Sequence, residues 1–280
     1  MTDHDAARQR AGLGYAVLSY GWWGSVIPVY FFLVRGVGPW DLLALRLLLG
    51  LPLLLLLLWI SGQWRDLVRV PRDRRARWRL PLTAVLLAAN WLGYLWAIVH
   101  DRTLEASLGY YTNPLVSVAL GAIFLGERLR PRQRVAVGLA AIGVSISLVH
   151  AIAAGGAAPI PWITFLLAFS FGFYGLLRKQ ADVPAMVGLT AEMFVLTPLG
   201  IGLLLWRVEQ GAAAEWAALP AWRGVLLALA GAITLAPLIW FAAAARRLPL
   251  KTVGLIQYIA PTGQFLLGLW LFGEQLTIAG

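Results

Sequence analysis

The sequence predicts an all-α integral membrane protein that crosses the bilayer about nine times. Hydrophobic residues make up 60% of the 280 residues, charged residues make up only 13%, and the mean hydropathy is +0.75. A soluble domain of this composition could not cover its surface with polar groups. The apolar residues come in blocks of roughly 20, the length at which a helix crosses a hydrocarbon core of about 30 Å. Blocks of this length exclude a β-barrel, whose strands would alternate over about ten residues.

Each apolar block lies between charged or Pro- and Gly-marked turns and is interpreted as one span. The nine predicted spans are 13–34, 40–60, 80–99, 104–125, 133–151, 160–178, 185–206, 222–245 and 251–272.

Basic residues are distributed unevenly between the two sets of connections. If the N-terminus is cytoplasmic, 18 of the 23 Arg and Lys residues fall in connections on the cytoplasmic side and four in connections on the other side. The positive-inside rule describes this asymmetry. We therefore expect a multi-pass protein of a bacterial-type cytoplasmic (inner) membrane, with a cytoplasmic N-terminus and the lipid bilayer as its surroundings. The net charge of +10 is thereby assigned to orientation, and no nucleic-acid partner is expected.

A pattern in the fourth predicted span recurs in the ninth. The segment LGYYTNP at 108–114 leads to GERL at 126–129, and LIQYIAP at 255–261 leads to GEQL at 273–276, always at an offset of 147 residues. SYGWWG at 19–24 likewise resembles SFGFYG at 170–175. Two copies in register indicate a duplication, with residues 1–151 as the first repeat and 152–280 as the second.

The repeating unit contains five spans, an odd number, so the second copy enters the membrane from the opposite side. The sequence thus predicts an inverted repeat, an arrangement in which transporters hold their substrate near the midplane, beside helices interrupted by Pro or Gly. Pro114 and Pro261 occupy equivalent positions, and we expect each to interrupt its helix and to take part in gating a central cavity. The second copy ends soon after Glu274, so we expect the tenth span, the counterpart of 133–151, to be missing from this chain.

The chain resembles the EamA group of the drug/metabolite transporter superfamily, and within it the RarD-type permeases. The resemblance covers nearly the whole chain and is carried by NWL at 90–92, LEASLGY at 104–110, NPLV at 113–116, FLGER at 124–128, AFSFGFYGL at 168–176 and QYIAPT at 257–262. It implies ten helices around a central cavity and the export of metabolites or drugs, with chloramphenicol associated with the RarD type.

Aromatic and amide side chains inside the apolar blocks are the candidates for the cavity wall. Aromatic rings suit amphipathic or cationic solutes, whereas an amide in hydrocarbon must find a polar partner. Core packing or bonding between helices is an alternative for each of them. The candidates are Trp22, Trp23, Asn90, Trp91, Trp96, Tyr110, Tyr111, Asn113, Tyr174, Gln257 and Tyr258.

Two ionisable residues lie inside predicted spans, where a charge is costly. Glu192 could bind a proton that couples to transport, or it could pair with a basic residue such as Arg46 and lock two helices together. Arg46 itself could snorkel outward or cap a helix.

The function expected from these features is secondary-active transport of a small molecule by alternating access, with protons as a candidate coupling ion. An intramembrane enzyme is an alternative, but the sequence has no HExxH motif or paired aspartates, and its three histidines are not clustered. A facilitative channel is the other alternative, although no filter-like segment is present. We expect no catalytic residues, metal site or cofactor.

Overall fold

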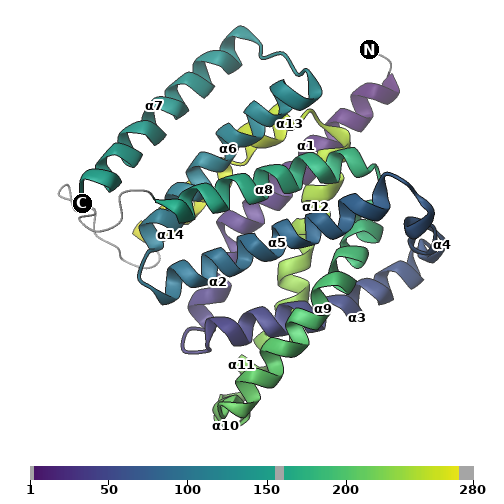
Figure 1. The fold of residues 1–280 in the computed structure, drawn as a ribbon, viewed down its shortest axis with the longest axis vertical. Coiled ribbons are helices and arrows are strands. Elements are labelled where there is room, and N and C mark those ends of the chain that lie inside the picture. The colour runs from purple at the N-terminus through teal and green to yellow at the C-terminus, as the bar shows by residue number, and fades with distance from the viewer. Residues whose placement is uncertain (1–2, 155–160, 271–280) are drawn as a thin grey trace.

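The computed structural model describes residues 3–154 and 161–270, and its regular structure within these ranges is entirely helical (Figure 1). Long helices cross the molecule, and short ones occur at joints and connections. The elements are α1 (Asp3–Gly24), α2 (Val26–Leu33), α3 (Pro39–Ile60), α4 (Trp64–Arg69), the 3-10 turn η1 (Val70–Arg72), α5 (Ala76–Val99), α6 (Thr103–Leu125), α7 (Pro131–Ala154), α8 (Trp162–Ala181), α9 (Ala185–Glu209), α10 (Ala212–Ala217), α11 (Ala221–Ala228), α12 (Ala230–Arg247), α13 (Leu250–Ile256) and α14 (Ile259–Trp270).

Several prolines and one glycine lie at helix ends, where their backbone preferences favour the start or the end of a helix. Pro39 and Pro131 are the first residues of α3 and α7, where the missing N–H of proline costs nothing. Pro184 and Pro249 immediately precede α9 and α13. Gly126 ends α6 in the left-handed conformation at φ 64°, which glycine adopts without steric penalty.

Within the described residues, seven helical segments are long and apolar enough to cross a membrane, so the chain is a multi-pass membrane protein. Each of the seven overlaps one of the nine predicted spans. The other two predictions, 160–178 and 251–272, correspond to α8 and to the α13–α14 pair, which are outside this set. α8 has 20 residues but carries buried polar side chains, and the last predicted span is divided into two short helices. By length and apolarity, the described residues therefore contain seven candidate membrane spans and not the nine that the sequence predicts.

The expected interruption at Pro114 is absent, because α6 runs through it without ending. Proline removes one backbone hydrogen bond, a loss that a membrane helix tolerates when neighbouring helices support it. α3, α5, α9 and α12 also contain an internal proline. Near Pro261 the chain does break, between α13 and α14, where Gln257 would have been the bonding partner of the missing N–H, and a similar break between α1 and α2 precedes Pro28.

The two halves of the chain interleave rather than forming separate bodies (Figure 1). α5 packs against α8 and α9, and α12 packs against α1 and α3. α6 contacts α8, whereas α14 contacts α1. α3 and α9 form a further extensive contact. The largest buried cluster is built where these helices cross and includes Leu47, Leu87, Tyr174, Leu196 and Phe241.

The outlier is α7, which packs against α6 at the edge of the bundle (Figure 1). No residue of its apolar window is buried.

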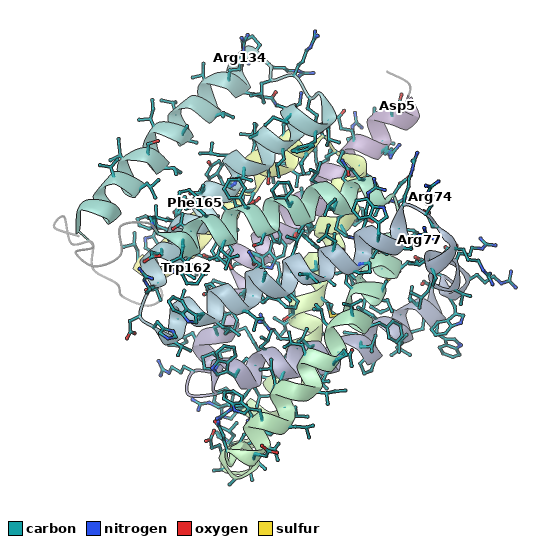
Figure 2. All side chains as sticks on the ribbon, in the orientation of Figure 1. Asp5, Arg74, Arg77, Arg134, Trp162 and Phe165 are labelled. Carbon is teal, nitrogen blue, oxygen red and sulfur yellow. The ribbon has the colours of Figure 1, made fainter. Side chains whose placement is uncertain are left out.

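Basic side chains gather along one edge of the bundle. Figure 2 shows Arg74, Arg77 and Arg134 along the upper right edge, with Asp5 of α1 on the same side. Trp162, at the start of α8, lies toward the opposite edge. The connections therefore fall into two sets, one basic and one poor in charge, at the two ends of the long helices.

Candidate functional site

A cavity of about 520 Å³ lies among the helices of the bundle. Its wall is built by residues of α1, α2, α3, α5 and α6 from the first half of the chain and of α8, α12 and α14 from the second. Phe31, near the end of α2, and Thr103, at the start of α6, also line it. Phe31 lies just before the connection between α2 and α3, and Thr103 lies just after that between α5 and α6. Both connections belong to the set with few basic residues, so the cavity lies toward that end of the bundle.

One wall of the cavity is aromatic. The ring centroids of Trp23 and Phe171 lie 5.7 Å apart with the rings nearly perpendicular, and those of Tyr20 and Trp23 lie 5.6 Å apart. Tilted and edge-to-face arrangements of this kind are favourable for aromatic rings. Phe241 packs behind Trp23 and Phe171 and holds them in place from α12.

Arg46 of α3 brings a charge into the cavity wall. Its guanidinium carbon lies 5.0 Å from the centroid of a Trp91 ring, a cation–π distance. Its Nε is buried and has no hydrogen-bond partner. Tyr94 and Tyr110 line the cavity on the same side, with ring centroids 5.7 Å apart.

Eight of the residues singled out in the sequence line this cavity. Several of them also bond across helices. Asn90 donates to the carbonyl of Leu167 at 3.1 Å and to Ser170 Oγ at 3.0 Å, Gln257 accepts from the Tyr20 hydroxyl at 3.4 Å, and the Tyr111 hydroxyl donates to the carbonyl of Pro261 at 3.5 Å. The eight are Trp23, Arg46, Asn90, Trp91, Tyr110, Tyr111, Gln257 and Pro261.

The other predicted residues lie elsewhere in the described structure. Trp22 donates from its indole to the carbonyl of Ile233 at 3.0 Å, and Trp96 stacks on His100 with centroids 4.1 Å apart. Asn113 accepts from Ser117 at 3.2 Å inside α6, near Pro114. Tyr258 does not line the cavity, and its hydroxyl is buried without a partner.

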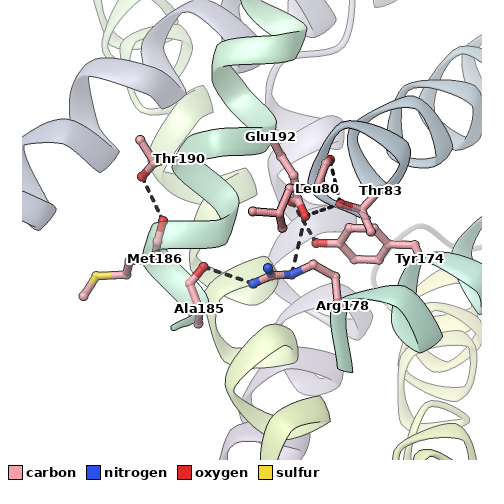
Figure 3. Close-up of polar contacts among 8 residues, drawn as sticks. All are labelled: Leu80, Thr83, Tyr174, Arg178, Ala185, Met186, Thr190 and Glu192. Atoms are coloured by element: carbon pink, nitrogen blue, oxygen red, sulfur yellow. Dashed lines mark hydrogen bonds and ion pairs between the residues drawn. The ribbon is translucent and has the colours of Figure 1, made fainter. Parts of the chain in front are cut away.

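Glu192 forms a buried polar cluster away from the cavity (Figure 3). Its Oε1 lies 3.4 Å from Nε of Arg178 and accepts from Thr83 Oγ1 at 2.7 Å. Its Oε2 accepts from the Tyr174 hydroxyl at 3.3 Å. Glu192 thus pairs with a basic residue, one of the two alternatives drawn from the sequence, but the partner is Arg178 and not Arg46, because α9 turns Glu192 toward α8 and α5.

Arg178 is the largest fully buried side chain of the cluster, with 1% of its surface exposed. Its Nη2 donates to the carbonyl of Ala185 at 3.2 Å, at the start of α9. Gly188 makes room for the guanidinium, since a Cβ there would overlap Nη1. The cluster lies close to the 182–184 connection, toward the basic end of the bundle, and the ring centroid of its Tyr174 lies 5.5 Å from that of Phe171 in the cavity wall.

Sequence reasoning missed several cavity residues, notably Tyr20, Phe31, Tyr94, Phe171 and Gln264. A signal was available for two of them, because Tyr20 and Phe171 lie inside the repeated SYGWWG and SFGFYG segments. Arg178 was interpreted as an orienting charge. Among residues 3–154 and 161–270, no three His, Cys, Asp or Glu side chains come together in a way that could hold a metal ion.

Some known proteins of similar sequence are named as transporters, and others are named RarD. The model of the EamA-like transporter family matches residues 10–149. An "Uncharacterized transporter" of Vibrio cholerae is 41% identical over 274 residues, covering 98% of this chain and 88% of that protein. "Protein RarD" of Escherichia coli K12 is 39% identical over 271 residues, covering 97% and 89%. "Chloramphenicol-sensitive protein RarD" of Pseudomonas aeruginosa is 31% identical over 266 residues, covering 89% and 81%.

A crystal structure of another protein shares the fold. That protein is 21% identical in sequence, and the two structures match with a TM-score of 0.65 over 98% of this chain and 91% of the other. At this identity the likeness speaks for the fold alone. The family match over half of the chain and the identities of about 40% over nearly its full length lead to one conclusion: the chain belongs to the EamA-like transporter family.

Proposed function

We propose that the protein is a secondary-active transporter that exports small metabolites or drugs across the bacterial inner membrane by alternating access around the central cavity. The observation that carries the proposal is a cavity of about 520 Å³ whose wall is shared by both halves of the chain. Small-molecule sites typically enclose about 300–1,000 Å³ and combine an apolar lining with a few polar groups. Arg46, Asn90 and Gln257 are such polar groups in a wall rich in aromatic side chains.

The inverted repeat is part of this proposal, with residues 1–151 and 152–280 as its two copies. Under the offset of 147 residues, α5 corresponds to α11–α12, α3 to α9, and α6 to α13–α14. The contact of α5 with α8 then has its counterpart in that of α12 with α1, and the α5–α9 contact in that of α12 with α3. A pseudo-two-fold axis in the membrane plane requires each contact between the halves to have such a counterpart.

The orientation we propose places the N-terminus and the basic connections in the cytoplasm. The cavity then lies toward the periplasm, and the Arg178–Glu192 cluster packs the cytoplasmic side beneath it. Rocking of the two halves would have to separate α5, of the first half, from α8 and α9 at this cluster to admit solute from the cytoplasm. Pro261, at the broken helix that borders the cavity, is the position at which we place the hinge.

Protons are the coupling ion that we propose, with Glu192 as the site. Two titratable groups face its carboxylate, the Arg178 guanidinium and the Tyr174 hydroxyl, together with the Thr83 hydroxyl. Protonation of Glu192 would remove the charge that holds Arg178 and would loosen the packing of α5, of the first half, on α8 and α9 at this cluster. A proton taken up here could thus bias the position of the two halves without entering the cavity.

An efflux screen tests the proposal. Cells that express the chain are loaded with a panel of metabolites and antibiotics, including chloramphenicol because of the name of the Pseudomonas aeruginosa relative. We expect lower retention of at least one compound, reversed by Trp91→Ala in the cavity wall. The matched control is Trp59→Ala in α3, whose side chain is 75% exposed and should leave export unchanged. Equal retention with and without the chain would contradict the proposal.

A further inference from the structure

Arg46 stands out in the cavity because it is a charged side chain without an opposite charge. Among the described residues that line the cavity, it is the one ionisable group that carries a charge at neutral pH, and no Asp or Glu accompanies it. An unpaired buried charge is expensive, and proteins normally supply a partner or use the charge to bind a ligand.

Three acidic residues of the helical bundle are already engaged elsewhere. Asp41, less than two turns before Arg46 in α3, is held by Arg207, whose Nε lies 2.6 Å from Oδ1. Glu105, in the first turn of α6, pairs with Arg102 at 2.6 Å. Glu192 pairs with Arg178. The protein thus provides a basic partner for each of these acids and leaves Arg46 facing the cavity.

Trp91 meets only part of the needs of the guanidinium. A cation–π contact stabilises the charge, but a ring face does not replace an oxygen acceptor in the guanidinium plane. Nε of Arg46 is buried without an acceptor in the described structure. A carboxylate or a similar planar oxyanion is the group that fits a guanidinium fork best.

The rest of the cavity wall determines which kind of uncharged body a solute can have. Trp23 and Phe171 offer apolar ring surface, and the amides of Gln257 and Gln264 offer a small number of polar contacts. We infer that the cavity selects organic anions, with the carboxylate of the solute on Arg46 and its aromatic or aliphatic body against Trp23 and Phe171. This inference rests on the proposed function, because it takes the cavity as the solute site.

The test measures binding of three matched probes to the purified full chain in detergent by isothermal titration calorimetry. The probes are 3-phenylpropionate, its neutral amide and 3-phenylpropylamine, which share a body and differ in charge. A hydrogen bond to a charged group contributes about 1.5–3 kcal/mol, so we expect the carboxylate to bind at least about tenfold more tightly than the amide. The amine should bind most weakly, because it would meet a like charge.

Two variants assign the preference to Arg46. In Arg46→Gln the carboxylate should lose its advantage and bind within about twofold of the amide, whereas Arg46→Lys should keep part of it, because the charge remains but the fork is lost. The matched control is Arg35→Gln, which removes an exposed arginine that also lies over an aromatic ring, Phe32, at 4.4 Å but does not line the cavity. This control should behave as the unmodified chain.

The possible outcomes distinguish a failure of the anion selectivity from a failure of the proposed function. Equal affinities for carboxylate and amide in the unmodified chain, or a carboxylate preference that survives in Arg46→Gln, would overturn the anion selectivity and leave the cavity as the solute site. A third variant, Ser107→Trp, fills the cavity and should abolish binding of every probe. Undiminished binding in Ser107→Trp would place the solute site elsewhere and overturn the cavity assignment itself. Absence of carboxylate binding to the unmodified chain would also overturn the inference, whereas the efflux screen judges the transport function independently.

Discussion

Glu127, just beyond the end of α6, caps the start of α13 in the other half of the chain. Its Oε1 accepts from the backbone N–H of Leu250 at 2.7 Å, and its Oε2 accepts from that of Lys251 at 2.8 Å. The first N–H groups of a helix lack partners within the helix, and a carboxylate there also interacts favourably with the helix dipole. Glu127 belongs to the repeated GERL segment, so this repeat motif joins the two halves.

Replacement of Glu127 should weaken the joint between α6 and α13. We expect Glu127→Ala to lower the apparent melting temperature in detergent by roughly 5 °C, because it removes two hydrogen bonds to a charged acceptor. Glu127→Gln should fall in between, since an amide offers one acceptor oxygen. Scanning fluorimetry measures the difference. The control is Glu209→Ala, at the exposed end of α9, and an equal loss in both alanine variants would contradict the capping role.

Gly188 should not tolerate a methyl group. Gly188→Ala would push Cβ into Nη1 of Arg178 and break the buried ion pair with Glu192, a loss that typically costs about 3–5 kcal/mol. Gly202→Ala is the matched control in the same helix, because nothing lies within 4 Å of its added Cβ. Thermal unfolding of both variants checks the prediction, which would fail if they were equally stable.

Removal of the charge on Glu192 should abolish any proton dependence of transport. Glu192→Gln keeps one acceptor oxygen for Thr83 or Tyr174 but no longer pairs with Arg178 as an anion. Efflux measured across a range of external pH should become flat in this variant. Arg46→Lys should retain the dependence, as should Glu105→Gln, whose carboxylate pairs with Arg102 outside the cluster. A pH profile unchanged in Glu192→Gln would remove Glu192 as the proton site.

The proposed topology can be tested with single cysteines, because the chain has none of its own. Cysteine in place of Arg72 or Arg132 should be protected from a membrane-impermeant maleimide added to intact cells. Cysteine in place of Arg223, in the charge-poor set of connections, should react. Labelling of Arg72 and Arg132 on opposite sides of the membrane would contradict the inverted arrangement of the two halves.

Much of the helical framework is predictable from the sequence, because hydrocarbon imposes length and apolarity on each span. The boundary of α3 at Ile60 and that of α5 at Val99 match the predicted ends at residues 60 and 99. Prolines were less informative. Pro114 and Pro261 are equivalent in the sequence, yet only the second lies beside a break, since neighbouring helices decide whether one lost hydrogen bond matters.

The site was predictable only in part, because apolarity fixes where a helix runs but not how it is rotated about its axis. Trp22 and Trp23 are adjacent and equally aromatic, yet Trp23 lines the cavity and Trp22 bonds to Ile233. The same rotation directs Glu192 toward Arg178 instead of Arg46. The side-chain partners that depend on the rotation of each helix can be identified only in the packed structure.

The outlying position of α7 makes it a useful point of attachment. Leu139 and Ile146 on this helix are 66% and 65% exposed, and none of its residues borders the cavity, so its outer face is free to contact lipid acyl chains. Bulky labels or a rigid fusion partner carried by α7 would add mass for electron microscopy without entering the path of the solute. The same face can accept extensive apolar replacement, which allows the fit of the protein to bilayers of different thickness to be adjusted separately from its selectivity.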